Sequence, residues 1–191
     1  MNFKVNKGNL LIVGFLFAFL FFLDLKAEKK DNEELLAYNK DSIYEKIDGK
    51  ELLQILKKET GVVVVVNQRQ DINSIINDLI DLKKEEKLYV YNSKSDELIL
   101  EIKNEKIAVK KESSGVYKKI IEQIGSYSDN YVIKMQEGDM IETEYKTINT
   151  PSILFINKGK ILYSFSPNLE ENNDYIIDIY KKGFDVLRTN N

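Results

Sequence analysis

The chain of 191 residues contains no cysteine, no histidine and no tryptophan, and it has only two prolines. Without cysteine it has no disulfide, no thiolate nucleophile, no iron–sulfur cluster and no lipid-modified cysteine. Without histidine it lacks an imidazole base and the usual zinc and non-haem iron ligands, so a bound metal would need hard oxygen ligands. We therefore expect no metal, no cofactor and no thiol–disulfide chemistry.

The composition is otherwise ordinary, with 43% hydrophobic and 31% charged residues, as in one globular domain. The net charge is −3, and residues 1–27 contribute +2 from three lysines and one aspartate, which leaves −5 for residues 28–191. Lysine and glutamate alternate, as between Lys103 and Glu112, and form no basic stripe. The pattern predicts a solvated surface and argues against a nucleic-acid partner.

An export signal is the clearest segment of the sequence. Lys4 and Lys7 precede an unbroken apolar run, residues 10–23. As a helix this run spans about 21 Å, less than the roughly 30 Å hydrocarbon core of a bilayer. Leu25 stands three residues from a cut after Ala27, where cleavage sites favour a small side chain. Residues 1–27 therefore fit an uncleaved signal anchor or a cleaved signal peptide, with a buried soluble helix as a third alternative.

The rest of the chain is predicted to form an α/β domain, residues 42–191, joined to this segment by a polar linker, residues 28–41. Residues 62–66 are five consecutive valines, which favours a central strand covered on both faces. Helical patterns begin at Asp48 and Ile72, and further strands are expected at residues 42–47 and 87–91. The order predicts a β-α-β unit with a parallel strand pair.

The second half of the domain alternates hairpins with helices. Alternating apolar residues predict a hairpin insert, residues 98–110. A helix ending at Gly125 follows, and then a strand at residues 131–135 with a turn at residues 137–139. A closing hairpin is expected at residues 152–165, and after it a last helix that begins at Asp174.

One segment resembles a known fold signature. Thr150-Pro151-Ser152, the apolar residues 153–156 and the turn residues 157–160 look like the Thr-Pro hairpin of thioredoxin folds, in which the proline is cis. Residues 117–134 are similar to Gram-positive bacteriocin transport accessory or thioredoxin-like proteins. The resemblance covers residues 44–165. It implies a three-layer α/β fold with a central mixed sheet, extended here by the hairpin insert and preceded by the N-terminal hydrophobic helix.

The sequence departs from that family at the redox site. In the family a C-P-x-C pair follows the strand that corresponds to residues 62–66. The two cysteine positions align here with Gln70 and Asn73, within a residue or two. Thiol–disulfide exchange needs a thiolate, which neither amide supplies. We therefore expect a redox-inactive relative that is not an enzyme.

The resemblance also suggests a binding site. In thioredoxin folds the residue before the cis-proline presents a backbone edge that pairs with an extended chain, so Thr150 and Pro151 are candidate peptide-binding residues. Arg69 is a candidate for an anionic group. The alternatives are that Thr150-Pro151 only sets the start of a strand, that Gln70 and Asn73 cap a helix, and that Arg69 is solvated.

These observations predict a binding or accessory protein outside the cytoplasm. It would be held at the membrane through residues 10–23, or secreted if the signal is cleaved, and would assist an exported peptide or protein. The alternative is a structural or surface-interaction protein of the cell envelope that binds no peptide.

Overall fold

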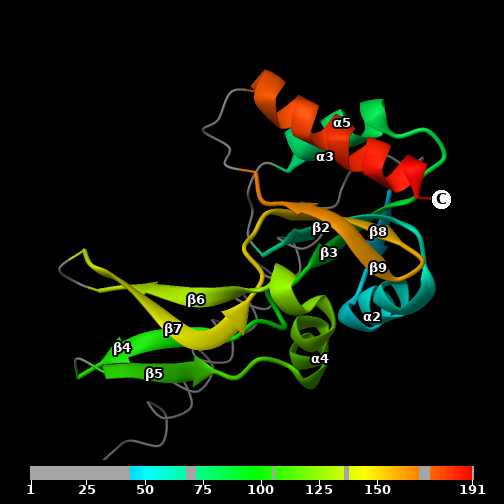
Figure 1. Cartoon of the computed structure of the whole chain (residues 1–191). Coiled ribbons are helices and arrows are strands. Elements are labelled where there is room, and N and C mark those ends of the chain that lie inside the picture. The colour runs from blue at the N-terminus through cyan, green and yellow to red at the C-terminus, as the bar shows by residue number, and fades with distance from the viewer. Residues whose placement is uncertain (1–43, 68–71, 105, 136–137, 168–172, 191) are drawn as a thin grey trace, which may run out of the picture. The chain divides into compact units, whose positions relative to one another are not determined.

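The computed structural model describes residues 44–67, 72–104, 106–135, 138–167 and 173–190 (Figure 1). The predicted export segment and linker, together with Arg69 and Gln70, lie outside the described residues. Within the described ranges, no helix has the length and apolar character needed to cross a membrane. The structure that follows belongs to one unit of the chain, residues 43–191.

A five-stranded mixed sheet forms the centre of this unit. Its strands stand in the order β1, β3, β2, β8, β9, with bounds Glu45–Ile47, Leu88–Asn92, Gly61–Val66, Ser152–Asn157 and Lys160–Phe165. Strands β1 and β2 both pair with β3 in parallel, whereas β8 is antiparallel to β2 and to β9. The predicted β-α-β unit and closing hairpin are both confirmed. The valine run is the middle strand, and none of its side chains is more than 1% exposed.

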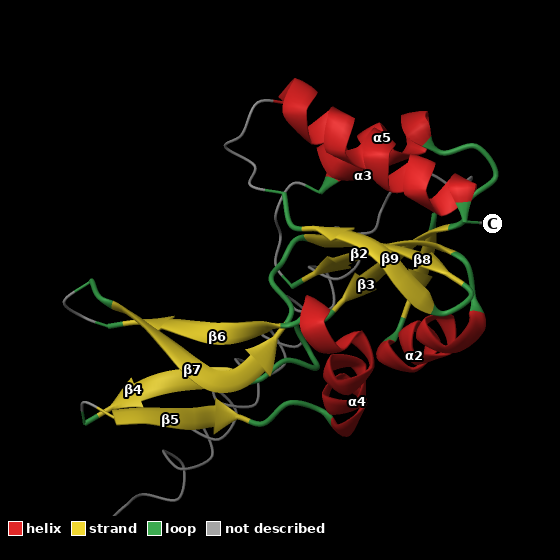
Figure 2. Ribbon diagram, viewed as in Figure 1, coloured by secondary structure: helices red, strands yellow, loops and turns green. Residues whose placement is uncertain are grey.

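Helices cover both faces of the sheet (Figure 2). Helices α2 and α4 (Gly49–Lys58 and Gly115–Ile124) pack together on one face, and a short 3-10 turn, Gly125–Tyr127, follows α4. Helices α3 and α5 (Asn73–Leu82 and Asn173–Thr189) pack together on the other face. The described part of the chain is therefore a mixed α/β fold with four α-helices around a mixed sheet, as the sequence predicted.

Local sequence signals explain where the helices begin and what they bury. The Asp48 carboxylate accepts hydrogen bonds from the N–H groups of Lys50 and Glu51, and the Glu51 carboxylate accepts from the Asp48 N–H at 2.7 Å. This capping box starts α2 at the predicted position. Alternate residues of β2 then face opposite layers, so that Val63 and Val65 pack in the core beneath α2 and α4.

The opposite layer is held by aromatic packing. The Phe155 ring of β8 meets the Phe184 ring of α5 edge to face, with centroids 5.3 Å apart. Gly183 allows this approach, because a Cβ atom at that position would lie 2.3 Å from two carbons of the Phe155 ring. A small residue in the middle of α5 therefore sets the distance between helix and sheet.

Two antiparallel hairpins lie outside the central sheet. The first, β4 and β5 (Ile99–Lys103 and Lys106–Lys111), confirms the predicted hairpin at residues 98–110 with its ends shifted by one residue. The second, β6 and β7 (Asp129–Lys134 and Met140–Thr147), contains the predicted strand but adds a partner that the sequence analysis missed.

The strand β7 was missed because its side chains give no burial pattern. Six of its eight residues are exposed, and only Thr143 and Thr147 are half-buried. Its pairing with β6 is also irregular between Asn130 and Val132.

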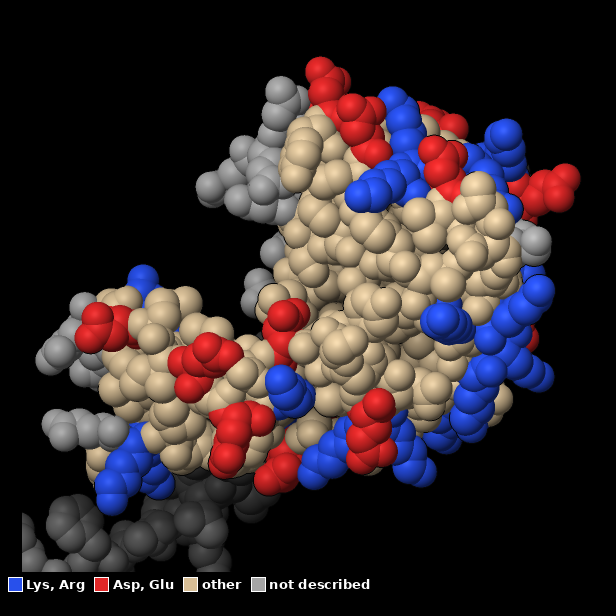
Figure 3. Space-filling model, viewed as in Figure 1, with Lys and Arg blue, Asp and Glu red and all other residues tan. Residues whose placement is uncertain are grey.

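Positive and negative side chains are interspersed on the face of the molecule drawn in Figure 3, over the hairpins and the helices alike.

Candidate functional site

A cleft of about 310 Å³ opens beside Thr150. Its walls come from four separate parts of the chain: the end of β2, the turn after β3, the hairpin β6–β7, and the segment that leads into β8. The lining residues are Asn67, Glu97, Tyr131, Val132, Thr147, Ile148, Asn149 and Thr150. One of the residues proposed from sequence, Thr150, therefore lies at the cleft.

The backbone around Thr150 has the predicted geometry. The Thr150–Pro151 peptide bond is cis. Pro151 is buried, whereas Thr150 is half-buried. The pairing of β8 with β2 starts at Ser152, opposite Val65. None of the loop and turn hydrogen bonds between described residues involves the Thr150 backbone. The Thr150 N–H and C=O groups thus have no such partner among the described residues.

Asn73 is not part of the cleft lining. It is the first residue of α3 and is exposed, and the N-cap position belongs to Ile72, which makes no side-chain capping bond. Asn73 is therefore not the N-cap, because the helix begins one residue earlier than a capping role for Asn73 requires. Gln70, the other residue of that interpretation, lies outside the described residues.

Among the described residues that line the cleft, Glu97 supplies the only carboxylate. Its oxygens accept hydrogen bonds from the Asn67 side-chain amide, at 3.1 Å, and from the Ser93 hydroxyl. Ser93 is fully buried, and its backbone N–H donates to the Val66 carbonyl at 2.7 Å. Two strand ends therefore fix the position of the carboxylate.

Burial raises the pKa of Glu97 above its ordinary value. The hydrogen bonds from Ser93 and Asn67 and the charge of Lys111 act in the opposite direction, and the nearby Asp96 carboxylate adds to the increase. The negative charge at the cleft is thus held at a cost in solvation, which is common at binding and catalytic sites.

Buried tyrosines support the same wall from behind. The Tyr117 hydroxyl accepts a hydrogen bond from the Ile148 N–H at 3.1 Å and lies 3.3 Å from the Thr147 hydroxyl. Burial raises the pKa of Tyr117 to about 12. The Tyr91 hydroxyl donates to the Asp96 carboxylate at 2.9 Å, and burial also raises its pKa. Both phenols therefore stay protonated and act as fixed supports.

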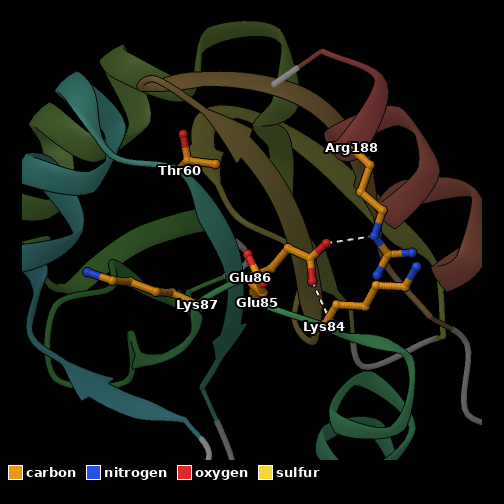
Figure 4. A pocket seen from close by; sticks show the side chains of 6 residues that line it. All are labelled: Thr60, Lys84, Glu85, Glu86, Lys87 and Arg188. Carbon is orange, nitrogen blue, oxygen red and sulfur yellow. Dashed lines mark hydrogen bonds and ion pairs between the residues drawn. The ribbon is translucent and has the colours of Figure 1, made fainter.

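A second pocket, of about 500 Å³, has six described lining residues, and three of them, Lys84, Glu86 and Arg188, are joined by hydrogen bonds (Figure 4). The Arg188 Nε donates to the Glu86 Oε1 at 2.7 Å, and its Nη2 donates to the Leu82 carbonyl at 2.9 Å. The other Glu86 oxygen accepts from the Lys84 N–H at 2.6 Å. These contacts form a clamp that joins α5 to the loop before β3. The pocket is therefore a weaker candidate for ligand binding than the cleft beside Thr150.

The chemistry that the cleft offers is recognition by hydrogen bonds and charge. No cysteine is present anywhere in the sequence. In the described part of the chain, no three acidic side chains are grouped as a metal site requires. The cleft combines one carboxylate, several hydroxyl and amide groups, and the apolar surface of Val132 and Ile148.

Comparison with protein-family models, with curated proteins and with solved structures found no match to this chain.

Proposed function

We propose that residues 42–191 form a thioredoxin-like domain that binds an extended peptide and carries out no redox chemistry. The strand order β1, β3, β2, β8, β9 and the cis Thr150–Pro151 bond support the thioredoxin-like assignment, because the resemblance implies a central mixed sheet and a cis-proline before the closing hairpin. The family's redox activity does not carry over, because no cysteine is available.

The observation that carries the proposal is that the Thr150 backbone, beside the cleft, makes no loop or turn hydrogen bond with the described residues. An extended chain that pairs with its N–H and C=O groups adds a short strand next to the start of β8, in the mode known as β-augmentation. Successive side chains of such a peptide point alternately into the cleft and away from it. The cleft then selects side chains while the backbone of Thr150 supplies affinity.

The location of this activity follows from the sequence. Residues 10–23 hold the domain at the outer face of the membrane, or the domain is released when the signal is cleaved. In either case the bound segment would be part of an exported peptide or protein that the domain assists. Arg69, near the end of β2 in sequence, remains a candidate for contact with an anionic group of that partner.

A peptide-binding assay tests the proposal. The full-length protein, in a non-ionic detergent, is applied to an array of capped nonapeptides. Thr150→Pro removes the backbone N–H and should abolish binding, whereas Thr150→Val changes only the side chain and should keep it. Far-UV circular dichroism shows whether both variants fold. Equal binding by Thr150→Pro, or no bound peptide at all, would overturn the proposal.

A second function, as a surface-interaction protein of the envelope, is favoured by the hairpins. Val132, Met140 and Tyr145 of the hairpin β6–β7 are 41–64% exposed, although they are large apolar side chains. Val132 pairs with Glu142, so Val132 and Met140 lie on the same face of the hairpin, and exposed apolar side chains that share a face mark contact surfaces. If Met140→Lys abolishes capture of a partner and Thr150→Pro does not, the hairpin rather than the cleft is the binding surface.

A further inference from the structure

The Glu97 carboxylate is not part of any ion pair formed between described residues. The charge of Lys111 lowers the pKa of Glu97. The Lys111 ammonium, however, donates hydrogen bonds to the backbone carbonyls of Ser95 and Lys94, at 2.6 and 3.5 Å. Each carboxylate oxygen can accept two hydrogen bonds. The bonds from Asn67 and Ser93 therefore leave capacity for a donor in the cleft.

The remaining walls favour a positive group. None of the described residues that line the cleft is a lysine or arginine, whereas Thr147, Asn149 and Thr150 provide oxygen acceptors. A partly buried carboxylate without a counter-ion is costly, and a cation placed beside it offsets that cost. An anion at the same place would meet the charges of both Glu97 and Asp96.

The cation that fits is organic rather than metallic. Small hard metal ions in proteins usually take several carboxylate oxygens, and no group of three acidic side chains is found in the described residues. An ammonium or guanidinium group instead presents several N–H donors at once, which suits one carboxylate surrounded by hydroxyl and amide oxygens. The apolar stem of a lysine or arginine side chain would lie along Val132 and Ile148.

We propose that the cleft selects peptides that carry a lysine or arginine side chain, whose cationic group donates hydrogen bonds to the Glu97 carboxylate. This inference rests on the proposed peptide binding at Thr150 and specifies its substrate class. The carboxylate is already held by Asn67 and Ser93, so little side-chain ordering is needed when the cation binds.

Two labelled peptides test the selection. Both are capped nonapeptides of alternating serine and valine, with lysine or glutamine at the centre, and fluorescence polarisation reports their binding to the full-length protein in a non-ionic detergent. The lysine peptide should bind about tenfold more tightly, as expected for a charged hydrogen bond in a partly exposed site. Glu97→Gln should remove this preference, so that the lysine and glutamine peptides bind this variant with equal affinity.

The control variant is Glu112→Gln, which neutralises an exposed carboxylate paired with Lys118 outside the cleft. It should keep the preference for the lysine peptide. Equal affinities of the two peptides for the wild-type protein would overturn the inference and leave the proposed peptide binding intact. A preference that survives in Glu97→Gln would overturn it as well.

A small cation separates the inference from the proposed function. If neither peptide binds, the proposed function fails, and n-butylammonium chloride then tests the cation site alone. At tens of millimolar it should raise the Tm of the wild-type protein relative to sodium chloride of equal ionic strength, and should not do so for Glu97→Gln. The same Tm in both salts would overturn the cation site.

Discussion

The Asn67 side-chain amide donates a hydrogen bond of 3.1 Å to the Glu97 carboxylate. Asn67 directly follows β2, and Glu97 lies in the turn after β3, so this bond joins the carboxyl ends of two parallel strands. In open α/β sheets, ligands commonly bind beyond the carboxyl ends of the strands. The bond therefore places the charged wall of the cleft where the architecture favours a binding site.

Glu97→Gln is expected to raise the free energy of unfolding at pH 7, by up to about 1 kcal/mol. Burial raises the pKa of Glu97 in the folded protein. The contribution of Glu97 to the free energy of unfolding therefore falls as the pH rises from about 4.5, the ordinary value, through the folded pKa. Urea unfolding between pH 4.5 and 7 measures this difference. It should be largest at pH 7 and shrink as the pH falls. If Glu97→Gln is less stable than the wild-type protein at pH 7, the charged form of Glu97 is not destabilising in the folded protein, and the prediction is wrong.

Arg188→Leu is expected to destabilise the protein by about 2–4 kcal/mol at pH 7, because the 8% exposed Glu86 carboxylate loses its partner. Burial alone would raise the pKa of Glu86, but the hydrogen bond and charge of Arg188, with backbone N–H donors, lower it. The stabilisation is therefore present above pH 4.5, the ordinary value, and is lost as the pH falls through the folded pKa.

Lys181→Leu is the matched control for this clamp. Lys181 pairs with Asp178 on the exposed surface of the same helix, at 3.0 Å. Its loss should change the free energy of unfolding by less than about 0.5 kcal/mol. Urea unfolding of both variants at pH 7 and pH 4 decides the matter, since equal effects would show that the Arg188 pair is no stronger than a surface pair.

Gly183→Ala is expected to lower the free energy of unfolding by about 1–3 kcal/mol, despite the higher helix propensity of alanine. The added methyl group would meet the Phe155 ring at 2.3 Å, so α5 must move away from β8. Gly115→Ala is the control, because a Cβ atom there has no atom within 4 Å. It should be neutral or slightly stabilising. Equal unfolding midpoints for the two variants would show that α5 tolerates the shift.

The central elements of the fold were predictable because their signals are local. The valine run specified the middle strand, Asp48 specified a helix start, and Thr150-Pro151 matched a known motif with a cis bond. The strand β7 was not predictable from periodicity, since an exposed two-stranded hairpin has no buried face to impose a pattern.

Only part of the cleft was predictable. Thr150 was found through the motif, but Glu97 and Tyr131 are brought to it by packing between segments far apart in the sequence. A signal for Glu97 did exist, because it closely follows a predicted parallel strand. Nothing local distinguished Tyr131 from a packing residue, since its role depends on where the hairpin β6–β7 lies.

The proposed alignment of Gln70 and Asn73 with a pair of redox cysteines gives a gain-of-function prediction. The wild-type protein should not accelerate the reduction of insulin disulfides by dithiothreitol, because thiol–disulfide exchange needs a thiolate. The double variant Gln70→Cys with Asn73→Cys should accelerate it above the buffer rate. Ser126→Cys with Asp129→Cys, with the same spacing elsewhere in the chain, controls for the mere presence of two thiols. Reduction of insulin disulfides by the wild-type protein above the buffer rate would overturn the proposal that the domain is redox-inactive.

The proposed export signal in residues 1–27 predicts where the cleft operates. Full-length protein should fractionate with membranes, because residues 10–23 are uninterrupted by charge, and protease added to intact cells should degrade the region after Glu28. A cytosolic enzyme that stays intact in the same cells is the control for lysis. N-terminal sequencing then separates the two forms: a mature start near Glu28 indicates cleavage and a secreted domain, whereas an intact Met1 indicates an anchor. Full-length protein that is soluble and protected from protease would contradict export, and it would place the peptide-binding cleft among cytosolic rather than exported partners.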